Sequence, residues 1–74
     1  MERYKNLSGD SGVLAYELRD DGIKVQFTEG TTYLYTIKSA GTENIETMKR
    51  LATNGRGLST FISRTVRSRY AAKF

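Results

Sequence analysis

Hydrophobic and polar residues alternate in the first half of the chain, as they do in a β-sheet that buries one face. In residues 23–28, isoleucine, valine and phenylalanine occupy every second position, and polar side chains fill the others. Residues 13–19 and 31–38 also have strand-like patterns, and turn-forming residues separate the three segments. The pattern therefore predicts a three-stranded antiparallel meander.

The turn between the first two segments decides how they pair. A two-residue Asp21-Gly22 loop pairs Leu18 with Val25, so that apolar side chains share a face. A three-residue loop over residues 20–22 would instead place charged side chains beside the apolar ones. We therefore expect the two-residue loop.

The second turn is predicted to be longer. A three-residue loop that ends at Gly30, with this glycine in the left-handed position of a β-bulge, pairs Val25 with Tyr33 and Ile23 with Tyr35. A two-residue turn would place a phenylalanine opposite a threonine, so the longer loop is preferred. The predicted buried face then consists of Leu14, Tyr16, Leu18, Ile23, Val25, Phe27, Tyr33, Tyr35 and Ile37.

Apolar residues at helical spacing follow the strands. After a linker over residues 39–42, the pattern of residues 43–53 predicts a helix. Asn54-Gly55 predicts the end of this helix through a left-handed cap. The apolar residues that it is expected to bury are Ile45, Met48, Leu51 and Ala52.

A second helix is predicted from about Leu58 toward Tyr70, with Gly57 or Ser59 as its cap. One side of this helix is apolar and the other is rich in arginine. The residues of the apolar side are Leu58, Phe61, Ile62, Thr65 and Val66.

Together these elements predict an α+β fold, in which a three-stranded antiparallel β-meander is followed by two α-helices packed on one sheet face. A chain of 74 residues can bury one thin core. We therefore expect a single domain over residues 1–74, of which residues 1–12 form an irregular lead-in.

The composition removes several classes of chemistry. The chain has no cysteine and no histidine, which excludes disulfides, thiolate metal sites, cysteine nucleophiles and histidine bases. We expect no enzyme, no cofactor, no metal site and no small-molecule substrate. No apolar run approaches the ~20 residues that span a membrane, and the N-terminus lacks the apolar region of a signal peptide. The expectation is a soluble, cytoplasmic protein without a membrane partner.

The net charge of +4 conceals an asymmetry along the chain. Residues 1–46 contain five basic and all eight acidic side chains, a net charge of −3, whereas residues 47–74 contain seven basic and no acidic ones. Such segregation is typical of a protein that binds a polyanion or an acidic protein surface. A solubilising helix face would show the same pattern, so both interpretations stay open.

The basic third of the chain supplies the candidate binding residues. Arg56 lies between two glycines before a helix start, where backbone donors favour an anion; an ordinary helix cap with a solvated arginine is the alternative. The basic side chains that follow could track a nucleic-acid backbone, and Tyr70 could contact a base. The nucleic-acid-binding candidates are Arg56, Arg64, Arg67, Arg69, Tyr70 and Lys73.

The tyrosine pair Tyr33 and Tyr35 has two interpretations. Sheets that bind RNA expose aromatic side chains for stacking on bases. In the predicted register, however, both tyrosines share their face with Ile23 and Val25, and the two helices must cover one face of the sheet. We therefore predict that the pair is buried.

Several of these residues give the chain a resemblance to a known family. It resembles the KTSC domain, a short module that occurs alone in bacterial proteins and at the C-terminus of some lysyl-tRNA synthetases. The chain departs from the family pattern before the first helix, where the usual Val-Pro is absent. The segments that carry the resemblance are the strand 23–30, the pair Tyr33-x-Tyr35, and Gly55-Arg56-Gly57 leading into a helix with Phe61, Ile62, Val66, Arg67 and Tyr70.

The resemblance implies an RNA-contacting module without catalytic residues, since RNA binding has been proposed for the family because of the synthetase fusion. The residues of the family motif that are expected to be structural are Tyr33, Tyr35, Gly55 and Gly57. The first function hypothesis is therefore a small RNA- or DNA-binding module. The second is a protein-interaction module that binds an acidic partner or adds a strand at a sheet edge.

Overall fold

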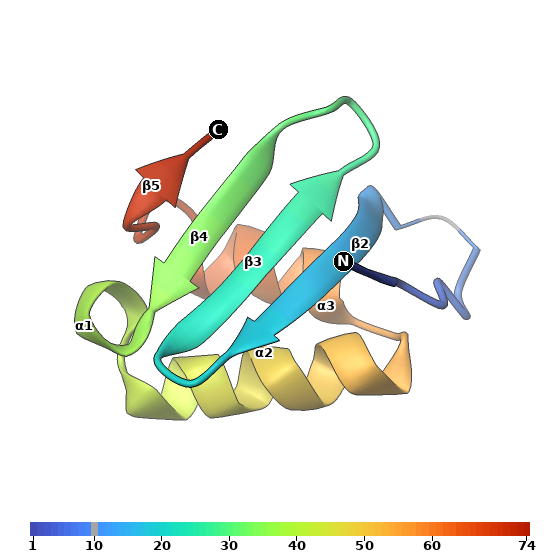
Figure 1. Cartoon of the computed structure of the whole chain (residues 1–74). Coiled ribbons are helices and arrows are strands. Elements are labelled where there is room, and N and C mark those ends of the chain that lie inside the picture. The colour runs from blue at the N-terminus through green and yellow to red at the C-terminus, as the bar shows by residue number, and fades with distance from the viewer. Residues whose placement is uncertain (10) are drawn as a thin grey trace.

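The chain folds into one antiparallel sheet with helices on one of its faces. The computed structural model describes residues 1–9 and 11–74, and Asp10, in the predicted lead-in, lies outside the described residues. The strands are β1 (Glu2–Arg3), β2 (Val13–Arg19), β3 (Gly22–Phe27), β4 (Thr32–Thr36) and β5 (Ala72–Lys73), in the order β1-β2-β3-β4-β5 (Figure 1). The helices are α1 (Ile37–Ala40), α2 (Thr42–Asn54), α3 (Leu58–Phe61) and the π-helical η1 (Ile62–Val66). The fold class is α+β, as predicted.

The sheet is wider than the predicted meander, because both ends of the chain add a short edge strand. β1 pairs Glu2 with Tyr16 on one edge, and β5 pairs Lys73 with Tyr33 on the other. The expected three strands form the centre. The expectation of an irregular lead-in over residues 1–12 was wrong only for Glu2–Arg3, since residues 4–9 and 11–12 belong to no helix or strand. Strands of two residues carry no alternation of their own, so only their backbone pairing reveals them.

Tyr4 shows how firmly the N-terminal segment belongs to the fold. Its side chain is 3% exposed and lies in the hydrophobic core. Its backbone N–H donates to the carbonyl of Leu14 at 3.0 Å. Its hydroxyl accepts a hydrogen bond from the backbone N–H of Leu58 at 3.3 Å. The first residues therefore connect the sheet with the start of the last helix.

The first hairpin has a different loop from the one predicted. The two loop residues are Asp20 and Asp21, and Leu18 pairs with Ile23 rather than Val25. Gly22 belongs to β3, where a Cβ atom would lie 2.1 Å from the carbonyl oxygen of Tyr35. The glycine is thus needed for the close approach of β4, not for the turn. Because the register differs by two residues, the same side chains still share a face.

Three residues of the predicted buried face are exposed instead. A bulge in β2 brings Val13, which is 2% exposed, into the core, and Leu14 is 37% exposed. Leu18 lies at the turn end of β2, and Ile37 has left the sheet to begin α1. The local pattern could not show these exchanges, because a bulge reverses the alternation within a strand.

The second hairpin has the predicted three-residue loop. Val25 pairs with Tyr33 and Ile23 with Tyr35. Gly30 has a φ of 106°, and its N–H donates to the carbonyl of Phe27 at 2.9 Å. The expected β-bulge geometry with a glycine at positive φ is confirmed.

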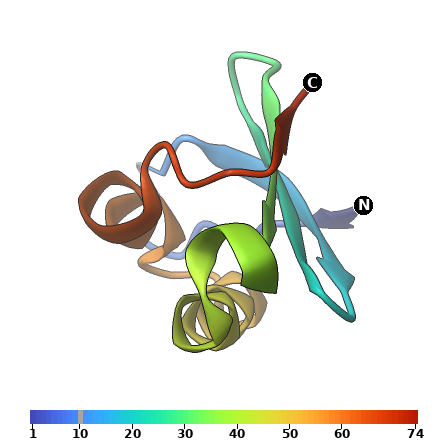
Figure 2. The same ribbon diagram turned by 90° about the vertical axis from the view of Figure 1, so that its left-hand side faces the viewer.

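All helices cover the same face of the sheet (Figure 2). α2 is the helix expected over residues 43–53, and it buries Ile45, Met48 and Ala52 completely. Gly55 ends it with a φ of 79°, which confirms the left-handed cap. The expected linker over residues 39–42 was wrong in part. Its first two residues belong to α1, which a capping box begins.

The last helix is shorter than predicted and changes its winding. It begins at Leu58 after the cap residue Gly57, as expected, but it continues as the π-helical η1 and ends at Val66. Tyr70 therefore lies beyond the helix, where the chain turns back toward β4. Leu58, Ile62 and Val66 are buried as predicted, Phe61 is half-buried, and Thr65 is exposed.

The close approach at Gly22 gives a prediction about stability. In the Gly22→Ala variant the new methyl group would collide with the backbone of β4, so the free energy of unfolding should fall by more than about 2 kcal/mol. Urea denaturation followed by circular dichroism measures this change. Gly12→Ala is the matched control, because its Cβ would meet only a ring carbon of Phe27 at 3.8 Å. An equal loss in both variants would contradict the steric explanation.

Candidate nucleic-acid interface

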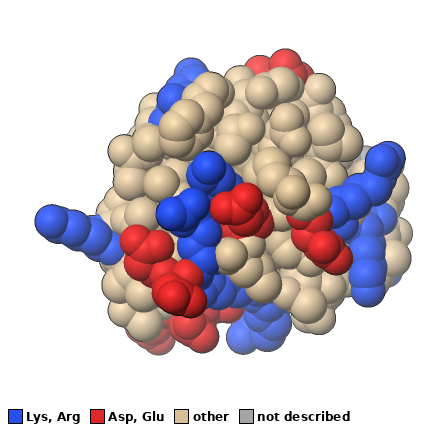
Figure 3. All heavy atoms as spheres, in the orientation of Figure 1, with Lys and Arg blue, Asp and Glu red and all other residues tan. Residues whose placement is uncertain are grey.

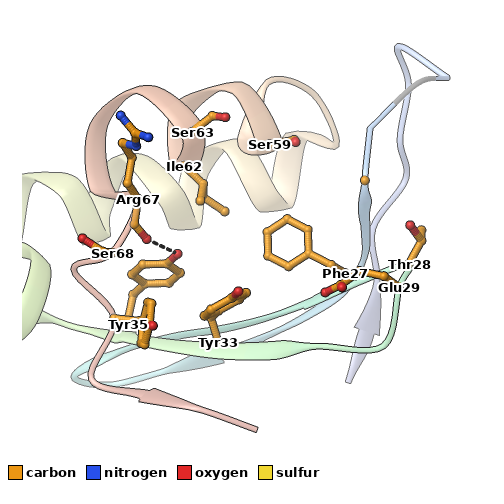
Figure 4. A pocket seen from close by; sticks show the side chains of 12 residues that line it. Phe27, Thr28, Glu29, Tyr33, Tyr35, Ser59, Ile62, Ser63, Arg67 and Ser68 are labelled. Atoms are coloured by element: carbon orange, nitrogen blue, oxygen red, sulfur yellow. Dashed lines mark hydrogen bonds between the residues drawn. The ribbon is translucent and has the colours of Figure 1, made fainter.

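A partly open cleft lies between the last helix and the end of the sheet where β3 turns into β4. Its volume is about 610 Å³. We call it the aromatic cleft, because its sheet side consists mainly of aromatic rings (Figure 4). Those rings belong to Phe27, Tyr33, Tyr35 and Tyr70, and the helix side includes Ser59, Ile62, Ser63 and Arg67.

The four rings pack against one another at the edge of the core. Tyr33 is central, with its ring centroid 5.6 Å from that of Phe27 and 4.8 Å from that of Tyr70. Tyr35 and Tyr70 meet edge to face with centroids 6.3 Å apart. Such arrangements suit the quadrupoles of the rings. Because Tyr33, Phe27 and Tyr70 are only half-buried, part of this aromatic surface remains open to the cleft.

The tyrosine pair therefore divides into two roles. Tyr35 is 1% exposed and belongs to the core, as predicted from the register. Tyr33 packs against the core but also lines the aromatic cleft. Both side chains lie on the helix-covered side of the sheet, so this pair forms no stacking platform on the open face.

The hydroxyl of Tyr35 connects the sheet to the C-terminal segment. It donates a hydrogen bond to the backbone carbonyl of Arg67 at 3.0 Å (Figure 4). Burial of this hydroxyl, together with the neighbouring Tyr33 and Tyr70, raises the pKa of Tyr35 to about 12. The hydroxyl is therefore a hydrogen-bond donor throughout the physiological pH range.

Arg67 has an unusual backbone conformation, with φ 30° and ψ −102°. Both of its backbone polar groups have partners: its N–H donates to the carbonyl of Ile62 at 2.7 Å, and its carbonyl accepts from Tyr35. These contacts hold an energetically unfavourable conformation directly after a π-helix. Strained residues and π-helical turns are frequent at functional sites. At the rim of the aromatic cleft the carbonyl of Arg67 faces the rings, whereas its exposed side chain points away from them (Figure 4).

The structure brings some of the predicted basic residues together and separates one of them. Arg64 lies in η1, and Arg69 lies two residues beyond Arg67, in the turn that follows η1. The side chains of Arg64 and Arg69 are exposed. Lys73 comes to the same region through β5, and its Nζ lies 5.7 Å from the centroid of the Tyr33 ring. Arg67 and Tyr70 line the aromatic cleft, and Lys73 lies beside one of its rings, whereas Arg64 and Arg69 are neighbours of Arg67 along the chain and are not among the lining residues.

Arg56 lies elsewhere. It lines a smaller polar hollow of about 290 Å³ with Gly57, Thr60 and two serines of the N-terminal segment, Ser8 and Ser11. The predicted phosphate seat is thus a separate place from the aromatic cleft. The two hollows share Ser59 in their linings.

The glycines on either side of Arg56 are required by the backbone conformation. Gly55 and Gly57 have φ angles of 79° and 84°, which disfavour side chains. At Gly55 a Cβ atom would also lie 2.5 Å from the Cβ atom of Lys5. These glycines allow the chain to reverse between α2 and α3, and so they set where the last helix begins.

The face of the sheet away from the helices carries a mixed charge. In the view of Figure 1, basic and acidic side chains are interspersed on this surface (Figure 3). Arg19 and Glu17 form an exposed ion pair there at 3.4 Å. This face therefore shows no uniform positive surface for a polyanion, and the exposed cations of residues 64–73 are the stronger candidates.

Sequence reasoning missed several residues that line the aromatic cleft. Phe27 was expected in the core but is half-buried at the cleft, and Ile62 was assigned only to the helix face. Glu29 and Ser63 had no predicted role. The sequence indicated only that residues 27–29 lie at a turn. It could not indicate a cleft, because the cleft forms only when the last helix lies over that turn.

Other kinds of site find no support in the part of the chain that the structure describes. Residues 1–9 and 11–74 contain no group of three or more acidic, histidine or cysteine side chains that could hold a metal ion. Among the same residues, no helix has the length and apolar character needed to cross a membrane. Comparisons with family models, curated proteins and solved structures found no match for this chain.

The Tyr35 hydroxyl gives a prediction about pH. In the Tyr35→Phe variant the carbonyl of Arg67 loses its donor, so the free energy of unfolding should fall by about 1–2 kcal/mol at neutral pH. The wild-type protein should also lose stability between pH 10 and 12. In this range the unfolded tyrosine ionises, whereas folded Tyr35 stays protonated up to about pH 12.

Urea denaturation of both proteins at several pH values measures this difference. The stabilisation by Tyr35 should be complete below pH 10 and should decrease by about 1–2 kcal/mol as the pH rises to 12. The variant lacks this contribution but keeps every other titrating group, which makes it the control. Parallel pH profiles for the two proteins would contradict the assignment.

Proposed function

We propose that this protein is a small, non-catalytic RNA-binding module that acts in the cytoplasm. The aromatic cleft takes an unstacked base, and the cations around it contact the adjoining phosphates. The observation that carries this proposal is Arg67, which is held in a strained conformation at the rim of an open aromatic cleft.

Stacking supplies the first part of the binding energy. Tyr33 and Tyr70 are half-buried, so the core holds their rings rigidly while some of their surface stays accessible. Stacking of one base on an aromatic side chain contributes about 1–3 kcal/mol and depends little on sequence. Rigid rings lose little conformational entropy on binding, which favours this contact.

Phosphate contacts supply the second part. Arg64, Arg67, Arg69 and Lys73 are all exposed, and among the described residues none of them forms an ion pair with an acidic side chain. Their charges can therefore be neutralised by a polyanion. Contacts of this kind release counterions and make the affinity depend steeply on salt. They position the nucleic acid but carry no information about its sequence.

One consideration favours a single strand over a duplex, and a second favours RNA. A base inside a duplex is stacked and paired, so it cannot enter a cleft lined by rings. The resemblance to the KTSC domain, with its fusion to lysyl-tRNA synthetases, also favours RNA.

The absence of cysteine is compatible with a reducing compartment such as the proposed cytoplasmic location.

The protein-interaction alternative has weaker structural support. Strand addition would need an accessible edge, but each edge of the sheet is a strand of only two residues, Glu2–Arg3 and Ala72–Lys73. Short edge strands offer few backbone groups for pairing. An acidic protein partner would have to use the same cations as RNA, and it would leave the aromatic cleft without a role.

Salt dependence tests the phosphate contacts. We expect a fluorescein-labelled single-stranded RNA to bind with a steep salt slope, measured by anisotropy, and a duplex of the same sequence to bind more weakly. The double variant Arg64→Ala/Arg67→Ala should reduce the slope by about 1.4, because each phosphate contact on a single strand contributes about 0.7. Its thermal unfolding should change little, since both side chains are exposed.

The matched control removes the same charge elsewhere. Lys38 in α1 and Arg50 in α2 are exposed and lie outside the lining of the aromatic cleft. Replacement of both by alanine should leave the salt slope almost unchanged. Equal effects of the two double variants would indicate nonspecific attraction, and the absence of binding to any RNA at low salt would overturn the proposed function.

The Tyr70→Leu variant tests stacking separately. Leucine keeps an apolar contact with the core but has no aromatic face, so the affinity for single-stranded RNA should fall about fivefold or more. The salt slope should stay the same, because no phosphate contact is lost. An unchanged affinity would exclude Tyr70 from the binding surface.

A further inference from the structure

The edge strand β5 and the residue after it place a cation beside an aromatic ring on each side of the sheet. Consecutive residues of an extended chain point to opposite faces. Lys73 lies on the helix-covered side, with its Nζ 5.7 Å from the centroid of the Tyr33 ring. Phe74 lies on the open side, where the Nζ of Lys24 is 5.1 Å from the centroid of its ring. The aromatic cleft and the Phe74 ring therefore lie on opposite sides of the same edge of the sheet.

The backbone of Phe74 is held in place while its ring is open to solvent. Phe74 exchanges two backbone hydrogen bonds with Thr32 of β4: its N–H donates at 2.7 Å and its carbonyl accepts at 3.2 Å. Its side chain is nevertheless 66% exposed. A ring with both faces covered would expose little more than its edge, so one face of this ring is free. A free aromatic face on an anchored residue is what an unstacked base needs for stacking.

Lys24 supplies a positive charge beside this ring. It lies between two buried residues of β3, so its side chain projects from the open face of the sheet. Glu17 is opposite Lys24 in the register, but the ion pair of Glu17 is with Arg19 at 3.4 Å. Among residues 1–9 and 11–74, Lys24 forms no ion pair with an acidic side chain. Its ammonium group can therefore contact the phosphate next to a base that stacks on Phe74.

A nucleotide fits this surface better than a protein partner does. The neighbours of Phe74 on the open face, Lys24 and Thr32, are polar, and this face carries charges of both signs (Figure 3). Stable protein interfaces bury more than about 1,000 Å² around an apolar centre, which one ring among polar side chains does not provide. A base needs only a single aromatic face.

We infer that Phe74 is a second stacking site, on which the same RNA strand places another base after it crosses the edge of the sheet at β5. One base occupies the aromatic cleft, and the connecting nucleotides pass between Lys73 on one side and Lys24 on the other. Because both bases belong to one strand, the second contact is intramolecular and raises the affinity of longer strands. This inference rests on the proposed RNA binding and extends it from one base to a strand of about four or more nucleotides.

The Phe74→Leu variant tests the second site with a labelled single-stranded RNA of about eight nucleotides. Leucine keeps an apolar side chain but has no aromatic face, so the affinity measured by anisotropy should fall about fivefold or more. Phe74→Tyr keeps the ring and should bind as tightly as the wild-type protein. Thermal unfolding should be the same in all three proteins, because the side chain is largely exposed.

A matched control removes an exposed apolar side chain elsewhere. Leu18 is 50% exposed on β2, and it does not line the aromatic cleft. Leu18→Ala should leave the affinity for RNA unchanged. An equal loss of affinity in Leu18→Ala and Phe74→Leu would indicate a nonspecific apolar effect and would overturn the inference.

The double variant Tyr70→Leu/Phe74→Leu shows whether the two rings hold different bases. The two losses should multiply, to about 25-fold or more, because residues on opposite faces of the sheet act independently. A dinucleotide is too short to reach both rings, so Phe74→Leu should change its affinity by less than about twofold. An equal loss with the dinucleotide and with the longer strand would mean that Phe74 acts through the aromatic cleft, which would overturn the second site.

The outcomes separate the inference from the proposed function. RNA binding that weakens in Tyr70→Leu but not in Phe74→Leu would overturn the second site and leave the proposed function intact. No binding of any RNA by the wild-type protein would overturn both. Sedimentation velocity detects the other possible occupant, a second copy of the chain. A wild-type dimer that Phe74→Leu converts to a monomer, with unchanged affinity for RNA, would also overturn the inference.

Discussion

Two tyrosine hydroxyls hold the last helix at its two ends, and the position of the candidate site depends on them. At the N-terminal end, Tyr4 accepts a hydrogen bond from the N–H of Leu58, where Gly57 supplies no side-chain cap. At the C-terminal end, Tyr35 donates to the carbonyl of Arg67, across 32 residues of chain. Helix ends leave backbone groups without intrahelical partners. Here partners from the N-terminal segment and from β4 satisfy them, and so they set where the helix lies over the sheet.

The strain at Arg67 has a consequence for the rest of the C-terminal segment. The abrupt change of direction after η1 lets the chain return to the sheet, where the N–H of Ala71 donates to the carbonyl of Leu34 at 2.6 Å. β5 then pairs Lys73 with Tyr33, and Tyr70 packs on the same ring. A local conformational cost at one residue is thus offset by hydrogen bonds and aromatic packing around it. The same contacts assemble the aromatic cleft and the cations beside it.

Charge segregation along the chain does not translate directly into a single basic surface. The fold separates the basic residues of the last third of the chain in space. Arg56 lines a polar hollow near the N-terminal segment, whereas Arg67 and Lys73 adjoin the aromatic rings. The site also includes Glu29 from the acidic part of the chain. Half-buried rings held by the core are suited to orient a flat ligand, which plain electrostatic attraction would not do.

Features that depend on neighbouring residues could be predicted from the sequence, because periodicity and glycine conformation act locally. The α+β class, the three-residue loop at Gly30, the burial of Ile45, Met48 and Ala52 in α2 and the end of α2 at Gly55 belong to this group, whereas Leu51 is only half-buried. The edge strands, the exposed Leu14, the early end of the last helix and the place of Tyr70 do not. They depend on a bulge, on backbone pairing between the chain ends and the sheet, and on a hydrogen bond between Tyr35 and Arg67. The sequence by itself thus determined which residues are aromatic or basic and, through its periodicity, most of those that are buried. Only the tertiary structure decided which of them meet at one cleft, because those contacts join segments that are distant along the chain.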